Sequence, residues 1–220
     1  MSLKRVAGIC CVLILVLPLL GQETAEKVEK ARKLLEVKDY RQAETVIREV
    51  LSTAPENSEA NYVLGLSLLG QDKFKEAEDA FLKAEKATPE TAREGADASS
   101  SPGLGAIQIG LARAYIGQKQ LDKAGAALAQ AEKMKPADPD VYYYRGMLDA
   151  HRQDYTAAAR DMDKVTELDP KRAYAYYYAG IAYNQIKKPD KMVERFQVFL
   201  KLAPDAPEAA KVKALLRVIK

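Results

Sequence analysis

Apolar residues along the chain follow a helical period that stops and restarts at regular intervals. From residue 24 onward they form pairs of short amphipathic segments, and each pair spans 34 residues. Polar residues with weak helix preference separate the two segments of a pair, and a proline follows the second segment. The pattern predicts helix–turn–helix units over residues 24–57, 58–91, 105–138, 139–172 and 173–206.

Equivalent positions in the five units carry similar residue types. The eighth positions are Ala31, Gly65, Ala112, Gly146 and Gly180, and the twentieth positions are Ala43, Ala77, Ala124, Ala158 and Met192. Small residues at both positions let the two helices of a unit approach closely. Met192 departs from this rule, so we expect the fifth unit to be splayed or repacked there.

The ends of the units follow the same register. Prolines occupy the thirty-second position of each unit, at Pro55, Pro89, Pro136, Pro170 and Pro204. Residues 92–104, which contain three serines followed by a proline and a glycine, interrupt the spacing, and their composition predicts a flexible loop. Residues 207–220 predict an amphipathic helix that closes the last open apolar face.

Five units in phase, with proline at one fixed position, resemble the tetratricopeptide repeat. The resemblance implies an all-α fold, a right-handed α-solenoid of helix–turn–helix repeats with a C-terminal capping helix. The first two repeats would occupy residues 23–91 and the other three residues 105–206. In this family the first helix of each unit lines a concave surface that binds extended peptides or partner helices. The implied function is a non-catalytic protein-binding scaffold.

The same resemblance places aromatic and aliphatic residues on the concave surface as a partner-binding groove. These residues are Tyr62, Leu66, Ile109, Arg113, Tyr143, Tyr144, Met147, Tyr174, Tyr177, Tyr178 and Ile181. The family favours tyrosine at the fifth position, but this preference does not account for Tyr144, Tyr174 or Tyr178. Tyrosine supplies a large contact area at low entropic cost, so the excess favours a binding groove. The alternative is an aromatic face that only supports the superhelix.

One ligand mode of the family is not expected here. Some members bind the acidic C-terminal carboxylate of heat-shock chaperones through lysine and asparagine side chains. The corresponding positions hold Val28, Arg32, Val63, Ala106 and Gly110. Since only Arg32 is a cation, the sequence does not support a cytosolic co-chaperone role.

The first 22 residues differ from the repeats. Two cations precede an apolar run over residues 6–20, which is the layout of a secretory signal peptide. As a helix this run would extend roughly 22 Å, less than the roughly 30 Å of a bilayer core. We therefore expect an exported protein, either periplasmic, secreted or lumenal. The alternatives are an uncleaved membrane anchor formed by residues 6–20 and a buried core helix.

Charge and reactive residues narrow the function further. The net charge of +3 falls to about +1 without the leader, too little for a nucleic-acid-binding surface. Both cysteines lie in the leader, and the single histidine, His151, has no convergent partners in the sequence. We expect no catalysis, no cofactor and no metal. A cell-envelope assembly or secretion factor remains the alternative within this class, and an accessory domain of an enzyme is the alternative outside it.

Two charged residues occupy positions where the family places apolar ones. Arg145 and Asp149 lie four residues apart in the first helix of the fourth unit. This spacing brings side chains together across one helical turn. The sequence therefore predicts a partly buried ion pair between them.

Overall fold

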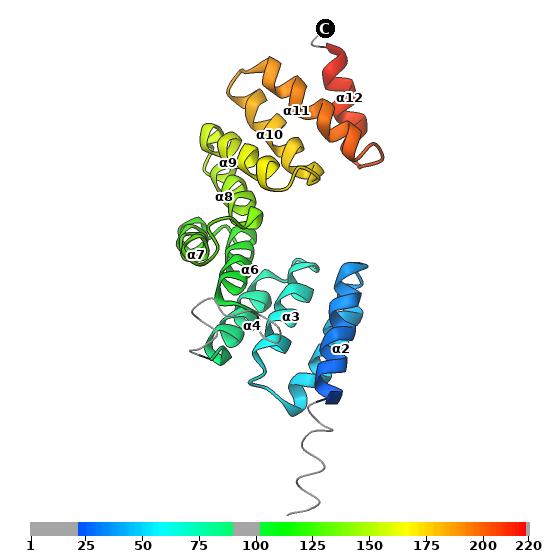
Figure 1. Ribbon diagram of the computed structural model, residues 1–220, viewed down its shortest axis with the longest axis vertical. Helices are drawn as coiled ribbons and strands as arrows, with labels where there is room; N and C mark the ends of the chain where they lie inside the picture. The colour runs from blue at the N-terminus through cyan, green and yellow to red at the C-terminus, as the bar shows by residue number, and fades with distance from the viewer. Residues whose placement is uncertain (1–21, 90–101, 219–220) are drawn as a thin grey trace, which may run out of the picture. The chain divides into compact units, whose positions relative to one another are not determined.

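The structure is a computed structural model that describes residues 22–89 and 102–218, and these residues form helices joined by short turns without a strand (Figure 1). The chain divides into two compact units, Met1–Gly110 and Leu111–Lys220. The predicted signal peptide and most of the predicted loop at 92–104 lie outside the described residues. Within the described ranges, no helix is long and apolar enough to cross a bilayer.

The first unit packs small residues against one large aromatic ring. Its helices are residues 22–36, α2 (Tyr40–Thr53), α3 (Ser58–Leu69), α4 (Phe74–Ala87) and the beginning of α6 (Leu104–Gly117). Phe81 of α4 is fully buried. A Cβ atom on Gly65 of α3 or on Gly110 of α6 would lie 2.6 Å from this ring. The glycine at the eighth position of this repeat therefore allows α3 and α4 to approach closely, as predicted.

The second unit continues the pairing to the end of the described chain. Its complete helices are α7 (Leu121–Met134), α8 (Pro139–His151), α9 (Tyr155–Leu168), α10 (Ala173–Gln185), α11 (Pro189–Leu202) and α12 (Ala209–Val218). Each of them contacts the next, and α10 also contacts α8 (Figure 1). Val212 of α12 is buried in the shared core, with Leu215 and Leu216 packed against it. The predicted capping helix is confirmed.

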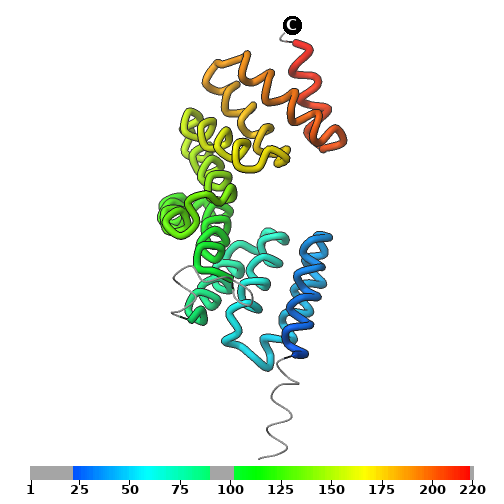
Figure 2. The backbone as a smooth tube through the Cα atoms, viewed as in Figure 1, coloured from blue at the N-terminus to red at the C-terminus, as the bar shows by residue number. Residues whose placement is uncertain are grey.

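The turn inside each repeat has the same backbone geometry. Lys38, Asp72, Lys119, Gln153 and Lys187, each at the fifteenth position, have φ between 57° and 63°. In the fourth repeat the N–H of Gln153 donates to Ala150 at 3.1 Å, and the N–H of Asp154 donates to Asp149 at 2.9 Å. This pair of bonds is the Schellman motif, which satisfies the last carbonyls of a helix. The breaks predicted between the two segments of each pair are therefore confirmed, and the turns can be followed in Figure 2.

Short polar side chains begin the helices that follow. The carboxylates of Asp39, Asp138 and Asp154, and the side-chain oxygen of Asn57, each accept a bond from a backbone N–H in the first turn of the next helix. Such caps satisfy donors that have no partner within the helix. Pro189 starts α11, where a missing N–H has no structural cost. The helix boundaries are thus set locally.

A recurrent bond connects neighbouring repeats through the proline at the thirty-second position. The side chain at the fourth position of a repeat donates to the carbonyl of that proline. The bonds are Asn61 Nδ2 to Pro55 (2.9 Å), Tyr142 Oη to Pro136 (2.7 Å) and Tyr176 Oη to Pro170 (3.2 Å). Tyrosines occur in two runs of three, at 142–144 and 176–178. The first tyrosine of each run makes this bond between repeats.

Two expectations about the packing have different outcomes. Met192 is 1% exposed within the core that contains Phe196, so the larger side chain is accommodated inside the fifth repeat. The predicted ion pair between Arg145 and Asp149 is wrong. Arg145 instead pairs with Asp161 of α9 at 2.5 Å and with Glu132 of α7 at 2.7 Å. Local spacing allowed the first pair, but the neighbouring helices present better-placed carboxylates.

Candidate partner-binding surface

Two consecutive tyrosine runs meet on α8 and α10 of the second unit. We call the resulting patch the tyrosine surface; it consists of Tyr143, Tyr144, Tyr174, Tyr177 and Tyr178. All five side chains are partly buried. They come together because α8 and α10 are in contact and each helix carries tyrosine at the fifth and sixth positions of its repeat. Tyr174, at the second position, lies one helical turn before Tyr177 and Tyr178.

The rings of the tyrosine surface form a continuous layer. The centre of the Tyr143 ring lies 5.2 Å from that of Tyr144 and 5.9 Å from that of Tyr178. The ring centres of Tyr177 and Tyr178 are 5.3 Å apart, and all three pairs meet edge to face. Phe199 of α11 supports Tyr177 at 5.2 Å. Edge-to-face pairs at such distances are a favoured arrangement of aromatic side chains. The layer is therefore held in place before any partner arrives.

Charged groups frame this layer with opposite signs. The guanidinium of Arg113 on α6 lies 5.1 Å from the centre of the Tyr144 ring. Arg172 lies 3.9 Å from the centre of the Tyr143 ring and also pairs with Asp140. Near α12, the hydroxyl of Tyr174 donates to Glu208 at 2.9 Å. The α6 end is therefore cationic and the α12 end is acidic.

The tyrosine hydroxyls stay protonated at neutral pH. Burial raises the pKa of Tyr143, Tyr144 and Tyr178 above the ordinary value of 10.0. The hydrogen bond to Glu208 raises the pKa of Tyr174. Neutral phenols both donate and accept hydrogen bonds. The surface therefore offers apolar ring area together with uncharged polar tips.

An apolar pocket of about 200 Å³ opens beside the tyrosine surface, between α8, α9 and α10. The sequence prediction named three of its lining residues, Met147, Tyr178 and Ile181. It missed Ala150, although this residue occupies a twelfth position, which the family places on the concave side. It also missed Tyr155, since that residue belongs to the second helix of the repeat.

The predicted groove residues are divided between the two units. Tyr62, Leu66 and Ile109 belong to the first unit, and the others belong to the second. Tyr62 packs 5.8 Å from Phe81. Ile109 is 6% exposed, so its side chain is part of the buried interior and does not contribute an exposed contact. Within the second unit, the predicted residues come together around the ring of Tyr178 and beside the apolar pocket.

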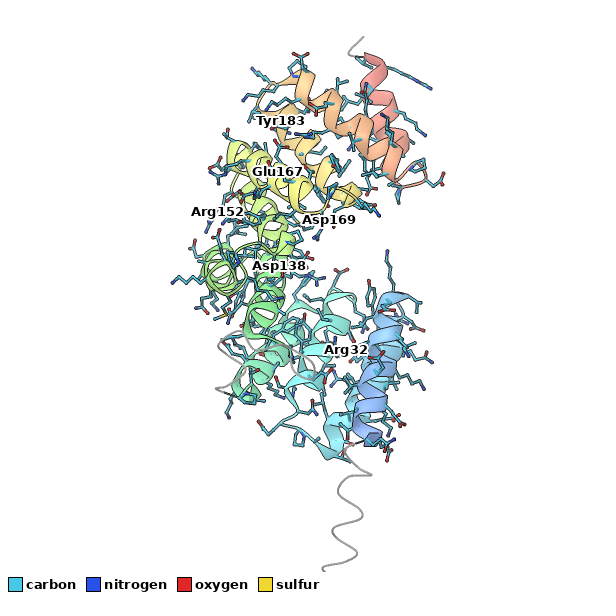
Figure 3. The ribbon with its side chains drawn as sticks, viewed as in Figure 1. Arg32, Asp138, Arg152, Glu167, Asp169 and Tyr183 are labelled. Atoms are coloured by element: carbon cyan, nitrogen blue, oxygen red, sulfur yellow. The ribbon has the colours of Figure 1, made fainter. Side chains whose placement is uncertain are left out.

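A second, polar pocket of about 540 Å³ is lined by Arg145, Asp161, Asp163 and Tyr183, among others. Its three carboxylates all have cationic partners inside the protein. Arg145 pairs with Asp161, and Asp163 accepts from Tyr183 at 2.5 Å and from Arg195 at 2.9 Å. Burial and the bond to Asp163 raise the pKa of Tyr183, labelled in Figure 3, to about 12. These groups stabilise the packing of α8, α9, α10 and α11.

The described side chains form no candidate metal site. Over residues 22–89 and 102–218, no three His, Cys, Asp or Glu residues gather closely enough to hold a metal ion. His151 is exposed at the end of α8, on the rim of the apolar pocket. The arrangement suits binding of apolar and polar side chains.

Antiparallel helix pairs with small residues at their crossings and a fixed turn geometry define a helical-repeat protein. Family models described as tetratricopeptide repeat match residues 28–92 and 150–207, and residues 94–148. The chain belongs to the tetratricopeptide repeat family. Its repeats account for the fold of both units.

Individual relatives agree with this assignment. Cell division cycle protein 27 homolog A of Arabidopsis thaliana is 29% identical over 98 residues, which is 44% of this chain but only 14% of that relative. The crystal structure of TTC0263, a TPR protein of Thermus thermophilus, has a TM-score of 0.71 at 16% identity, covering 88% of this chain and 98% of its own. YrrB, described as a TPR protein with an unusual peptide-binding site, has a TM-score of 0.56 at 24% identity, covering 86% and 90%.

Proposed function

We propose that the protein is a non-catalytic scaffold that binds a peptide or partner helix through the tyrosine surface of α8 and α10. The observation that carries this proposal is the continuous layer of five partly buried tyrosines. The layer packs on the buried rings of Phe196 and Phe199, yet all five tyrosines remain partly exposed and available for contact. The peptide-binding site for which YrrB is described supports the proposal by analogy.

The chemistry of the layer suits protein recognition. Tyrosine and arginine are enriched where binding energy concentrates at interfaces. Preorganised rings lose little entropy on binding. A partner segment can cover the rings with apolar groups and leave the neutral hydroxyls hydrogen-bonded.

The test is a double substitution, Tyr144→Ser with Tyr178→Ser, in the full chain. Peptides selected from a displayed random library on the wild-type protein serve as the probe, and their affinity is measured by fluorescence polarisation. Each lost aromatic contact contributes about 0.5–1.5 kcal/mol, so affinity should fall by roughly tenfold or more.

Tyr142→Ser is the matched control. Tyr142 lies on the same helix, but it bonds to Pro136 and lines the polar pocket. The control should retain peptide affinity. If the double variant binds as tightly as wild type, or if it melts far below wild type, the tyrosine surface is structural and the proposal is wrong.

Export is a second part of the proposed function. It is motivated by the two cations and the apolar run of the leader. N-terminal sequencing of the protein from its own host should find a chain beginning near residue 22, in an extracytoplasmic fraction. A full-length membrane-bound product would support the anchor alternative, and a cytosolic product starting at Met1 or Ser2 would contradict both.

A further inference from the structure

The apolar pocket beside the tyrosine surface has the size of one side chain. Its volume is about 200 Å³. A buried apolar cavity of about 150 Å³ holds a benzene ring, whereas pockets for small ligands measure about 300–1,000 Å³. Apolar groups of Met147, Ala150, Met162 and Ile181 form its walls. Methionine walls adapt to varied apolar shapes.

The pocket is lined partly by core residues and is open to solvent. Two of its lining residues, Met162 and Ala158, are 1% and 2% exposed, so they belong to the core. Three others, Met147, Tyr178 and Ile181, are partly exposed. A partner side chain could therefore enter without unfolding any helix.

One cation of the tyrosine surface has no ion-pair partner among the described residues. Among the described residues, Arg113 contacts the Tyr144 ring and forms no ion pair, whereas Arg172 pairs with Asp140. Arg113 does not occupy any of the positions that the chaperone-binding relatives use for a carboxylate. A carboxylate next to it would form a charge-assisted hydrogen bond beside a desolvating aromatic layer.

The spacing between cation and pocket limits the partner. Two rings, Tyr144 and Tyr143, link Arg113 to Tyr178 on the pocket wall. The successive separations are 5.1, 5.2 and 5.9 Å. An extended peptide advances about 3.3 Å per residue, so a carboxylate within about five residues of an apolar anchor reaches both places.

From these observations, and resting on the proposed binding role, we infer that the partner is an extended segment with two recognition elements. One is an apolar side chain that fills the pocket between α8, α9 and α10. The other is an acidic residue, within about five positions, that pairs with Arg113. The charge of Arg113 and the volume of the pocket together define this ligand class.

Synthetic fluorescent peptides test the inference on the full chain. The series carries one Phe and one Glu at separations of one to six residues in a Ser-Ala background. Matched peptides replace Phe by Ala or Glu by Lys. For the best separation, replacing Phe should weaken binding at least tenfold, and replacing Glu by Lys should weaken it at least threefold.

Variants assign the two contacts. Ala150→Leu fills the pocket and should abolish the preference for Phe with little loss of thermal stability. Arg113→Glu should reverse the preference from Glu to Lys. Ile181→Ala removes one wall and should weaken the Phe peptide, so the test holds even if Ala150→Leu folds poorly. Ala129→Leu, at an exposed position of α7, is the control and should change nothing.

The outcomes separate this inference from the proposed function. If Tyr144→Ser with Tyr178→Ser weakens library-selected peptides but Ala150→Leu and Arg113→Glu do not, the binding surface stands and the inference is wrong. If Ala150→Leu converts a dimer to a monomer in light scattering, a second copy fills the pocket and the inference is also wrong. The inference is also wrong if replacing Phe or Glu leaves the peptide affinity unchanged at every separation in the series.

Discussion

Arg145 of α8 donates from Nε to Oδ2 of Asp161 on α9 at 2.5 Å, and the Asp161 side chain is 2% exposed. The same guanidinium donates to Glu132 of α7 at 2.7 Å. One arginine therefore connects three consecutive helices. A buried carboxylate requires such a partner, because an unpaired charge in the interior carries a large desolvation cost.

Removing Asp161 should destabilise the second unit. In Asp161→Ala, Arg145 keeps its charge in a partly buried position and loses its closest partner. Because Glu132 still pairs with Arg145, the expected cost is about 1–3 kcal/mol. Urea denaturation followed by circular dichroism measures the change, and an effect below about 1 kcal/mol would contradict the buried-pair interpretation.

Asp149 provides the contrasting substitution on the same helix as Arg145. Burial raises its pKa, and the nearby carboxylates of Asp161 and Asp154 raise it further. A folded-state pKa above the unfolded value means that ionisation opposes folding, so stability is lost as pH rises through this range. Asp149→Asn should therefore be as stable as wild type at pH 7 or slightly more stable. A marked loss of stability in Asp149→Asn would instead indicate that Asp149 forms an ion pair with Arg145.

The left-handed turn residues predict a route to higher stability. Gln153 is exposed and has φ of 63°, a conformation that costs a residue with a Cβ atom about 1 kcal/mol. Gln153→Gly should raise the free energy of unfolding by about this amount. Gln130→Gly, in an exposed part of α7, should lower it by about 1 kcal/mol. Equal changes at the two positions would contradict the role of the turn geometry.

Glu44 predicts a pH dependence for the first unit. Burial opposes its ionisation, but hydrogen bonds from Lys73, Gln71 and Arg48 outweigh burial and lower its pKa from 4.5 to about 2. The resulting stability is present above the unfolded pKa and is lost as pH falls from about 4.5 towards 2. Glu44→Gln should melt earlier at pH 6 and show a flatter acid limb. The exposed Glu36→Gln is the control and should preserve the wild-type profile.

The crossing of α10 and α11 depends on a missing Cβ atom. A Cβ on Gly180 would lie 2.6 Å from the ring of Phe196, which is fully buried. Gly180→Ala should destabilise the second unit by about 1–3 kcal/mol through overpacking. Gly103→Ala, whose Cβ would meet no atom within 4 Å, should be tolerated. Partial recovery on adding Phe196→Leu would identify the ring as the cause.

The sequence by itself determined the repeat register, the helix boundaries, the turns and the capping helix. These features depend on local physics: capping side chains such as Asp39 and Asp154, helix-ending prolines, and apolar periodicity within one or two turns. Because these features recur five times in phase, a chance match in one unit could not account for the pattern. The tyrosine runs were visible for the same reason.

Only the tertiary structure decided which side chains meet. Arg145 could reach Asp149 along its helix, but α7 and α9 place Glu132 and Asp161 closer to its guanidinium. Tyr142 and Tyr143 are neighbours in sequence, yet one bonds to a backbone carbonyl and the other joins the aromatic layer. The apolar pocket depends on three helices at once. Contacts between helices depend on packing across the whole unit, so the local sequence pattern does not predict them.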